Sequence, residues 1–214
     1  WFVKKMYTNI SSIAISGKGF ENKLQPYSNK NLKFHYLPNW PDELNVDLDS
    51  YSFSKEEKTH FTFAGNIGKI QNLENIINAF LLLPIEFKEA SQLNIIGDGS
   101  HLEELKKMKI QTNVIFHGKK PREEMARYYK SSDFLIVSLI DKPIFSTLVP
   151  AKTQTYIAAK KPILAVINGE ASDLIRAHNL GYSVHPNKIE DIKNSFIKCI
   201  DADKETISTF TKNR

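Results

Sequence analysis

Three short glycine-bearing segments follow apolar runs and are suited to binding an anion. The first contains Gly65, Asn66, Gly68 and Lys69, directly after the apolar run 60–64. Glycine lets backbone amides approach an anion without a Cβ in the way, and a lysine beside a helix N-terminus adds positive charge. The spacing therefore predicts a phosphate cradle. An ordinary strand-to-helix turn uses the same residue types, so both interpretations stand at this point.

The other two segments occupy the same place relative to an apolar run. Gly97, Asp98 and Gly99 follow the run 93–96, and Gly118 with Lys119 follows the run 114–117. In an open α/β sheet, ligands bind outside the carboxyl ends of the strands, so these turns indicate one shared edge. The main chain near Gly118 could meet the edge of a base. None of the turns matches the fingerprints of dinucleotide-binding oxidoreductases or P-loop NTPases, which argues against both classes.

A fourth segment combines hydroxyl side chains with a predicted helix start. Residues 139–149 have no clear period and lead into Pro150, which is typical of the first turn of a helix. A pyrophosphate could accept hydrogen bonds from the following set, with Lys152 one turn into the helix to neutralise it without a metal. The set is Ser146, Thr147 and the amides of Leu148 and Val149. A surface loop before an ordinary helix is the alternative.

No set of metal ligands is evident in the sequence. The six histidines are scattered, and Cys199 is the single cysteine, so neither a zinc set nor an internal disulfide can be assembled. Two Asp-x-Asp pairs occur, Asp47 with Asp49 and Asp201 with Asp203, and both lie away from predicted strand ends. We therefore expect no metal site and no required cofactor.

The elements that must position these segments form an alternating pattern. Six short, mostly apolar runs from residue 58 onward are separated by amphipathic stretches with helical spacing. The runs are 60–64, 93–96, 114–117, 134–139, 163–167 and 182–185. This pattern predicts an α/β fold with a six-stranded parallel sheet that is covered by helices on both faces.

The first part of the chain differs from the rest. An apolar run near residues 10–15, a short helix from Phe20 and a strand at 34–37 precede the segment Pro38-Asn-Trp-Pro41. Residues 42–57 are acidic and have no period, so we interpret them as a connector between residues 1–41 and a main domain at 58–214. Because Trp1 and not Met opens the chain, we expect a piece of a longer protein.

Composition limits the function classes. The chain has 214 residues, a net charge of +5, and no apolar run near the roughly 20 residues that a spanning helix needs. A single cysteine and the absence of a secretory signal favour the cytosol. The positive charge suits an anionic partner such as a phosphate ester, a lipid headgroup or nucleic acid. A nucleic-acid-binding module stays an alternative, although the aromatic residues lie in buried periodic patterns and not between basic ones.

Taken in order, these segments resemble a known family. They read Phe63-Ala-Gly-Asn-Ile-Gly-Lys-Ile-Gln-Asn-Leu-Glu74, Ile95-Ile-Gly-Asp-Gly-Ser100, Asn113-Val-Ile-Phe-His-Gly118, Tyr128-Tyr-Lys-Ser-Ser-Asp133 and Val149-Pro-Ala-Lys-Thr-Gln-Thr-Tyr156, with Lys161-Pro162. The set is similar to the C-terminal, donor-binding domain of glycosyltransferase family 4, the retaining group of the two-Rossmann-domain (GT-B) architecture. The resemblance implies a Rossmann-like domain preceded by a short remnant of an N-terminal domain.

The resemblance also implies a donor substrate and roles for particular residues. The donor is a nucleoside-diphosphate sugar, most often UDP-linked, while a polysaccharide or lipid-linked acceptor binds the other domain. Phosphates would face Gly65, Asn66, Gly68 and Lys69. The nucleotide would lie against Gly97, Asp98 and Gly99, the base against the main chain of Gly118 and Lys119, and the diphosphate against Ser146 to Val149 and Lys152. Lys69 and Lys152 would stabilise charge on the departing diphosphate.

The sequence departs from the family pattern at three positions, Thr147, Thr155 and Lys160, the last of which stands where the family commonly has a glycine before Lys-Pro. Thr147 and Thr155 stand where the family often carries glutamates, so a hydroxyl must replace the ribose-binding carboxylate. Such variants resemble the branch that builds capsular polysaccharide and lipopolysaccharide, often with amino or deoxy sugars. They also leave open a non-catalytic relative that binds sugar nucleotides. A lipid-linked acceptor would bring the full-length enzyme to the inner face of the membrane as a peripheral protein.

Overall fold

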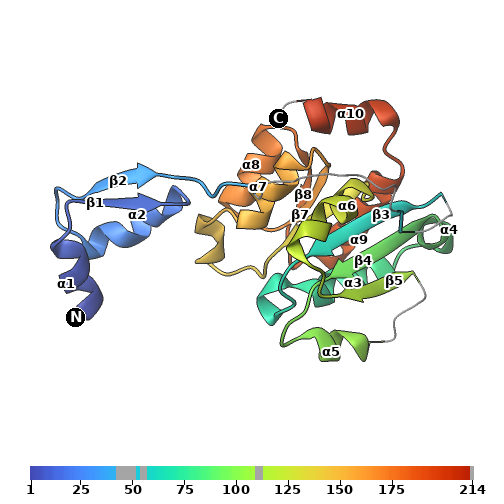
Figure 1. Ribbon diagram of the computed structural model, residues 1–214, viewed down its shortest axis with the longest axis horizontal. Helices are drawn as coiled ribbons and strands as arrows, with labels where there is room; N and C mark the ends of the chain where they lie inside the picture. The colour runs from blue at the N-terminus through green and yellow to red at the C-terminus, as the bar shows by residue number, and fades with distance from the viewer. Residues whose placement is uncertain (42–51, 54–56, 109–112, 213–214) are drawn as a thin grey trace.

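A computed structural model of the protein describes residues 1–41, 52–53, 57–108 and 113–212. It contains one two-stranded and one six-stranded sheet. Figure 1 shows the two-stranded unit (blue) to one side of the six-stranded sheet and next to α7 and α8. Most of the predicted connector 42–57 and the pair Asp47 and Asp49 lie outside the described residues.

The six-stranded sheet is parallel throughout and has the strand order β5-β4-β3-β6-β7-β8. The chain starts in the middle at β3, moves outward to β5, and then returns to β6 on the other side. This reversal between β3 and β6 is the topological switch point, where open α/β sheets bind ligands. The strands are β3 (Thr59–Ala64), β4 (Ser91–Ile96), β5 (Val114–Gly118), β6 (Phe134–Ser138), β7 (Ile163–Val166) and β8 (Gly181–Val184). All six predicted strands and the Rossmann-like sheet are thereby confirmed.

Helices cover both faces of this sheet. The α-helices are α3 (Leu73–Leu81), α4 (Ile85–Glu89), α5 (Leu102–Lys106), α6 (Met125–Lys130), α7 (Ala151–Ala158), α8 (Glu170–Ala177), α9 (Ile189–Ile200) and α10 (Lys204–Lys212). Short 3-10 helices lie between them at η2 (Lys69–Gln71), η3 (Arg122–Glu124) and η4 (Phe145–Thr147). Residues of α3, α5 and α9 pack into one core cluster, whereas α6, α7 and α8 contribute to the other. The period-two alternation of the strands divides their side chains between the two clusters.

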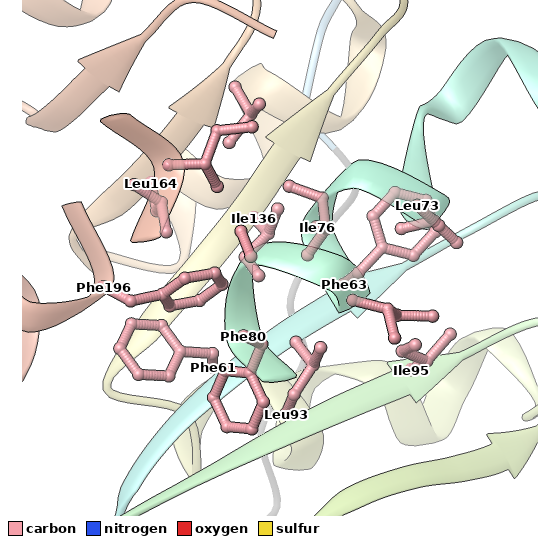
Figure 2. Packing of buried hydrophobic residues seen from close by; sticks show 14 of the residues in the cluster. Phe61, Phe63, Leu73, Ile76, Phe80, Leu93, Ile95, Ile136, Leu164 and Phe196 are labelled. Carbon is pink, nitrogen blue, oxygen red and sulfur yellow. The ribbon is translucent and has the colours of Figure 1, made fainter. Parts of the chain in front are cut away.

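The first core cluster is built around aromatic rings. Phe61 on β3 meets Phe196 on α9 edge to face, with ring centroids 4.8 Å apart, and Phe80 on α3 lies 5.3 Å from Phe196. Figure 2 shows these three rings beside the aliphatic side chains of neighbouring strands. Cys199 of α9 is buried in the same cluster, and burial raises the pKa of its thiol well above the usual value. This packing fixes the strands whose ends form the ligand edge.

The opposite face of the sheet carries a polar patch that the sequence pattern does not predict. His60, Gln92 and Asn94 are buried there. Asn94 accepts hydrogen bonds from Gln92 (2.7 Å) and lies 2.8 Å from Nε2 of His117. The ring of Phe53 lies over both histidines, with centroids 5.2 and 5.3 Å away. Because burial opposes the charged form, it lowers the pKa of both imidazoles.

Residues 1–41 form a small unit with its own parallel strand pair. It contains α1 (Phe2–Thr8), β1 (Ser12–Ile15), α2 (Gly19–Leu24), the 3-10 helix η1 (Gln25–Tyr27) and β2 (Lys33–Tyr36). The predicted strands and the helix near Phe20 are confirmed, whereas α1 is not predicted by the sequence. Trp1, Phe2 and Trp40 are strongly exposed. The division of the chain at residues 41 and 57 stays a proposal.

Among the residues that the structure describes, no helix combines the length and apolarity that crossing a membrane requires.

Candidate functional site

The carboxyl edge of the sheet contains a cavity of about 660 Å³ at the ends of β3 and β4. Six of the residues expected at the ligand site line it, namely Gly65, Asn66, Gly97, Asp98, Gly99 and Lys119. The remaining lining residues are Ala64, Ile96, Lys120, Pro121, Arg122, Met125 and Tyr129. The two glycine turns after β3 and β4 therefore meet in one site, and the segment after β5 supplies a basic wall.

The two turns fit together because they lack side chains where they touch. Gly97 has φ +140°, and a Cβ there would lie 1.9 Å from the carbonyl oxygen of Gly65. The amide of Gly65 donates to the carbonyl of Ile96 at 2.9 Å, and the amide of Ile67 donates to that of Asp98 at 2.8 Å. Such close backbone approach at positive φ requires glycine at position 97.

The glycine amides do not form the anion cradle that the sequence predicts, because their hydrogen bonds go to other parts of the protein. The amides of Gly65 and Gly68 already donate within the protein, to Ile96 and to Oε1 of Gln71. Gly65 instead provides space, because a Cβ there would lie 3.0 Å from Nζ of Lys152. Likewise, the carbonyl of Gly118 accepts from Gly97 at 2.9 Å, so it holds the ends of β4 and β5 together.

Lys152 does not itself line the cavity, but its Nζ lies directly behind Gly65, a glycine that does. Its Nζ is buried, has no hydrogen-bond partner among the described residues, and sits 3.8 Å from the ring centroid of Phe63. Burial lowers the pKa of this amine from 10.5 to about 7. A buried ammonium without a counter-charge is costly, and an entering anion would relieve that cost.

Helix α7 directs Lys152 to this place. Lys152 and Tyr156 are four residues apart and therefore share a face of the helix. The hydroxyl of Tyr156 accepts from the amide of Ala64 (3.2 Å) and donates to its carbonyl (3.3 Å). This pair of bonds ties α7 to the end of β3, so the helix presents its N-terminus and Lys152 at the switch point.

The segment from Ser146 to Val149 leads into α7, with Pro150 at the position before its first residue. The Ser146 hydroxyl donates to the carbonyl of Pro143, and the Thr147 hydroxyl donates to that of Ile144, both at 2.9 Å. Each hydroxyl has a single proton, so in this arrangement neither donates a hydrogen bond to a pyrophosphate as the sequence predicts. Thr155 is buried on α7. The cavity lining contains neither this segment nor Thr155.

Lys69 is placed differently from Lys152. Its Nζ lies 3.7 Å from a carboxylate oxygen of Glu104, and its side chain is 75% exposed. It lines a second cavity of about 220 Å³, together with Asn72, His101 and Glu104. Lys69 therefore borders only the smaller cavity, whereas Lys152 lies against Gly65 and Phe63, so the structure places the two lysines expected at the diphosphate in different surroundings.

Sequence reasoning missed several cavity residues. Lys120, Arg122, Met125 and Tyr129 come from the stretch after β5, where the lysine pair reads as an ordinary solvated loop. The sequence feature that could have indicated them is Pro121, which stands directly before the 3-10 helix η3 and lines the cavity together with this basic stretch. In the described part of the chain, no three His, Cys, Asp or Glu side chains are grouped so that they could hold a metal ion. Metal independence stays a prediction.

Solved structures share this fold. Anabaena HepE, crystallised with UDP-glucose, matches 98% of this chain and 59% of its own with a TM-score of 0.74 at 14% identity. WaaG, a glycosyltransferase involved in lipopolysaccharide biosynthesis, matches 94% of this chain and 56% of its own, with the same TM-score and identity. At such identities the likeness shows the fold alone.

Two curated relatives are similar in sequence. WbjE of Pseudomonas aeruginosa, a probable glycosyltransferase, is 27% identical over 194 residues, which are 85% of this chain and 48% of that protein. MJ1069 of Methanocaldococcus jannaschii, an uncharacterized glycosyltransferase, is 30% identical over 149 residues, which are 68% of this chain and 37% of that protein. The chain thus spans half or less of the length of these relatives. The family model for glycosyl transferases group 1 matches residues 48–213, most of the chain, and the chain therefore belongs to the group 1 glycosyltransferases.

Proposed function

We propose that the chain is the donor-binding half of a retaining glycosyltransferase, which transfers a sugar from a nucleoside-diphosphate sugar to an acceptor held by a second half. Lys152 is the observation that carries this proposal. Its amine is buried with no hydrogen-bond partner in the described part of the chain, and it lies at the switch point behind Gly65, which lines a cavity walled by glycine turns and basic residues. A diphosphate is the ligand whose charge and size suit that combination.

The diphosphate would lie between Lys152 and the N-terminus of α7. This helix has eight residues, and its positive end favours an anion. Glycosyl transfer breaks the bond between the anomeric carbon and a phosphate oxygen, so negative charge grows on the departing diphosphate. A fixed ammonium and the oriented backbone amide of Val149 would stabilise that charge in the transition state. The amide of Leu148 makes a long hydrogen bond to the carbonyl of Phe145 (3.5 Å) and would join them only after giving up that bond. Lys69 would join them only after leaving Glu104.

The nucleoside would occupy the cavity. Gly97 to Gly99 provide a flat wall, Asp98 and Lys119 provide polar groups at its rim, and the cavity volume of about 660 Å³ suits a ligand of this size. The relatives of known structure support UDP, since HepE was crystallised with UDP-glucose. The role of the Thr155 hydroxyl in place of a carboxylate at the ribose stays a prediction from the family resemblance, because Thr155 is buried and does not line the cavity.

The acceptor and the type of sugar belong to the same proposal. The relatives are more than twice as long as the matched region, which supports a second domain that binds a polysaccharide or a lipid-linked acceptor. We propose a hexosyl or N-acetylhexosaminyl transferase of family 4, which builds capsule or lipopolysaccharide in the cytoplasm and contacts the inner face of the membrane where the acceptor is a lipid. The similarity to WbjE and the fold of WaaG support this direction.

Calorimetric titration of the chain with UDP tests the donor site. We expect binding that Lys152→Ala weakens by about a hundredfold, since a charge-assisted contact to a phosphate contributes about 2 to 3 kcal/mol. Lys198→Ala is the matched control, because Lys198 is an exposed lysine on α9, a helix that packs on the opposite face of the sheet from α7. No heat of binding at millimolar UDP would contradict the proposal.

A non-catalytic relative that binds sugar nucleotides is the second candidate. Thr147 and Thr155 favour it, because neither position offers a carboxylate. The two candidates differ in the full-length protein, where only a transferase releases UDP when donor and acceptor are both supplied. Binding without release, under conditions where a relative of the same branch turns over, would support the non-catalytic function.

A further inference from the structure

We infer that Glu170 is a positioning residue of the donor site, which clamps a turn of the small N-terminal unit onto the loop Ser146–Val149. We name Ser146–Val149 the diphosphate loop, and this name rests on the function proposed above. Glu170 is the first residue of α8 and does not line the cavity. It would therefore act on the donor only through the chain segments that it holds.

The carboxylate of Glu170 binds two successive amides of the small unit. Oε2 accepts from the amide of Lys18 at 2.8 Å, and Oε1 accepts from the amide of Gly19. These two amides lie at the N-terminus of α2, and the first amides of a helix have no carbonyl acceptor within the helix itself. Hydrogen bonds from an amide to an ionised carboxylate are stronger than neutral ones, so this contact joins parts of the chain 151 residues apart.

The clamped turn rests directly on the diphosphate loop. A Cβ on Gly17 would lie 2.3 Å from the carbonyl oxygen of Thr147, and a Cβ on Gly19 would lie 2.9 Å from the Cβ of Thr147. Neither glycine has a positive φ that would demand it, so the requirement is for space. The turn can approach Thr147 this closely only because both of its contacting residues lack side chains.

The diphosphate loop is held at two further points. Gly169, which precedes Glu170, packs against Ser146 so closely that a Cβ would lie 2.0 Å from the Ser146 carbonyl oxygen. On the other side, the side-chain amide of Asn39 reaches the carbonyl of Val149 at 3.4 Å. The loop is thus enclosed between the start of α8 and residues 17–39, and Glu170 is the charged group that joins the two.

This enclosure has a consequence for the donor. The loop leads through Pro150 into the first turn of α7, so its position sets where the amide of Val149 and the ammonium of Lys152 point. Displacements of about 1 Å at groups that stabilise a transition state can cost about a hundredfold in rate. Loss of the clamp would therefore weaken the diphosphate contacts although Glu170 touches no part of the ligand.

The test compares Glu170→Ala and Glu170→Gln with Asp173→Ala in the same chain. Asp173 lies in the same first turn of α8, is exposed, and carries the same charge, so it controls for the loss of an acidic group at that helix end. UDP affinity by calorimetry, amide hydrogen exchange of residues 145–149 and the thermal midpoint are measured for each variant. Glu170→Gln keeps the size and one of the two acceptor oxygens, so it should partly rescue the loss.

We expect Glu170→Ala to weaken UDP binding about tenfold or more and to speed exchange in the diphosphate loop, while Asp173→Ala changes neither. Unchanged exchange and affinity in Glu170→Ala overturn the inference, as does an equal loss in Asp173→Ala. If the unaltered chain fails to bind UDP, the proposed function is overturned. The exchange measurement then decides by itself whether Glu170 holds the loop. If Glu170→Ala does not fold, an affinity of Glu170→Gln equal to that of the unaltered chain overturns the inference.

Discussion

Replacing Lys152 by methionine should make the protein more stable and weaken the binding of its donor. The amine is buried over the ring of Phe63 and has no hydrogen-bond partner among the described residues, so its charged form is held in an apolar place. Methionine has nearly the same length, contains no charge, and makes favourable sulfur contacts with aromatic rings. The substitution therefore removes the desolvation cost and keeps most of the packing.

The magnitude follows from the pKa of Lys152. Its fall from 10.5 to about 7 corresponds to about 5 kcal/mol of free energy, at about 1.4 kcal/mol per tenfold change in the protonation equilibrium. Relaxation around the charge and loss of the contact with the Phe63 ring reduce this value. Apolar replacements of buried charged groups typically stabilise by about 1 to 4 kcal/mol, and we expect a gain of about 3 kcal/mol at pH 6.

The gain must depend on pH in a defined direction. The unfolded chain keeps Lys152 protonated up to its ordinary pKa of 10.5, whereas the folded chain releases the proton above about pH 7. The unfavourable contribution is therefore complete below pH 7, shrinks between pH 7 and 10.5, and is absent above that range. The advantage of Lys152→Met over the unaltered chain should shrink along the same range.

Chemical denaturation at pH 6, 8 and 10 measures the free energy of unfolding of both proteins. Lys198→Met on the exposed face of α9 controls for replacing any lysine. A Lys152→Met variant that is less stable at pH 6, or whose advantage is constant from pH 6 to 10, refutes the reasoning that this amine is buried without a partner. UDP titration of the same samples should show affinity lowered by about a hundredfold, because the stabilised variant lacks the diphosphate's counter-charge.

Three further predictions concern the elements around the site. Gly97→Ala should lower the free energy of unfolding by about 2 kcal/mol or more and weaken UDP binding, because the new Cβ would lie 1.9 Å from the carbonyl oxygen of Gly65. Chemical denaturation and calorimetry check this, and an unchanged denaturation midpoint would contradict it. Tyr156→Phe should cost about 1 to 3 kcal/mol, because the amide and the carbonyl of Ala64 each lose one hydrogen bond. A loss confined to stability, with UDP affinity intact, would disprove the role of Tyr156 in placing α7. The pKa values of His60 and His117 are lower in the folded chain than the ordinary value of 6.5. Below about pH 6.5 the unfolded chain therefore binds more protons at these two histidines than the folded chain does. Stability should thus fall as pH drops below about 6.5 and fall less in His117→Gln, as urea titrations at pH 7 and 5 would show.

The sheet and its helices could be predicted from the sequence because their signals are local. Each strand is a short apolar run with a turn behind it, and the stripe on α3 has helical spacing from Leu73 to Phe80. Parallel order then follows from the alternation of strands and helices. Helix α1 was missed because its stability does not come from a buried stripe, since none of its residues is buried.

The candidate site was predictable only in part. Residue type and position were enough to single out Gly65, Gly97 and Lys152 in the sequence, and the structure places Gly65 next to the other two. The hydrogen-bond acceptors of the glycine amides were not predictable. The amides of Gly65 and Gly68 donate to Ile96 and Gln71, and the packing of the turns in three dimensions determines these partners. Contacts such as that of Glu170 with Gly19 join residues too far apart in sequence for spacing to reveal them.

The buried thiol of Cys199 gives the protein a built-in reporter of its own opening. The thiol is buried in the core cluster that contains the aromatic rings of α9 and β3, and its raised pKa leaves almost no thiolate at neutral pH. An alkylating reagent should therefore modify only molecules in which α9 has left the sheet. The rate of that single labelling event would track the population of the opened state, with no introduced probe and no disturbance of the ligand edge.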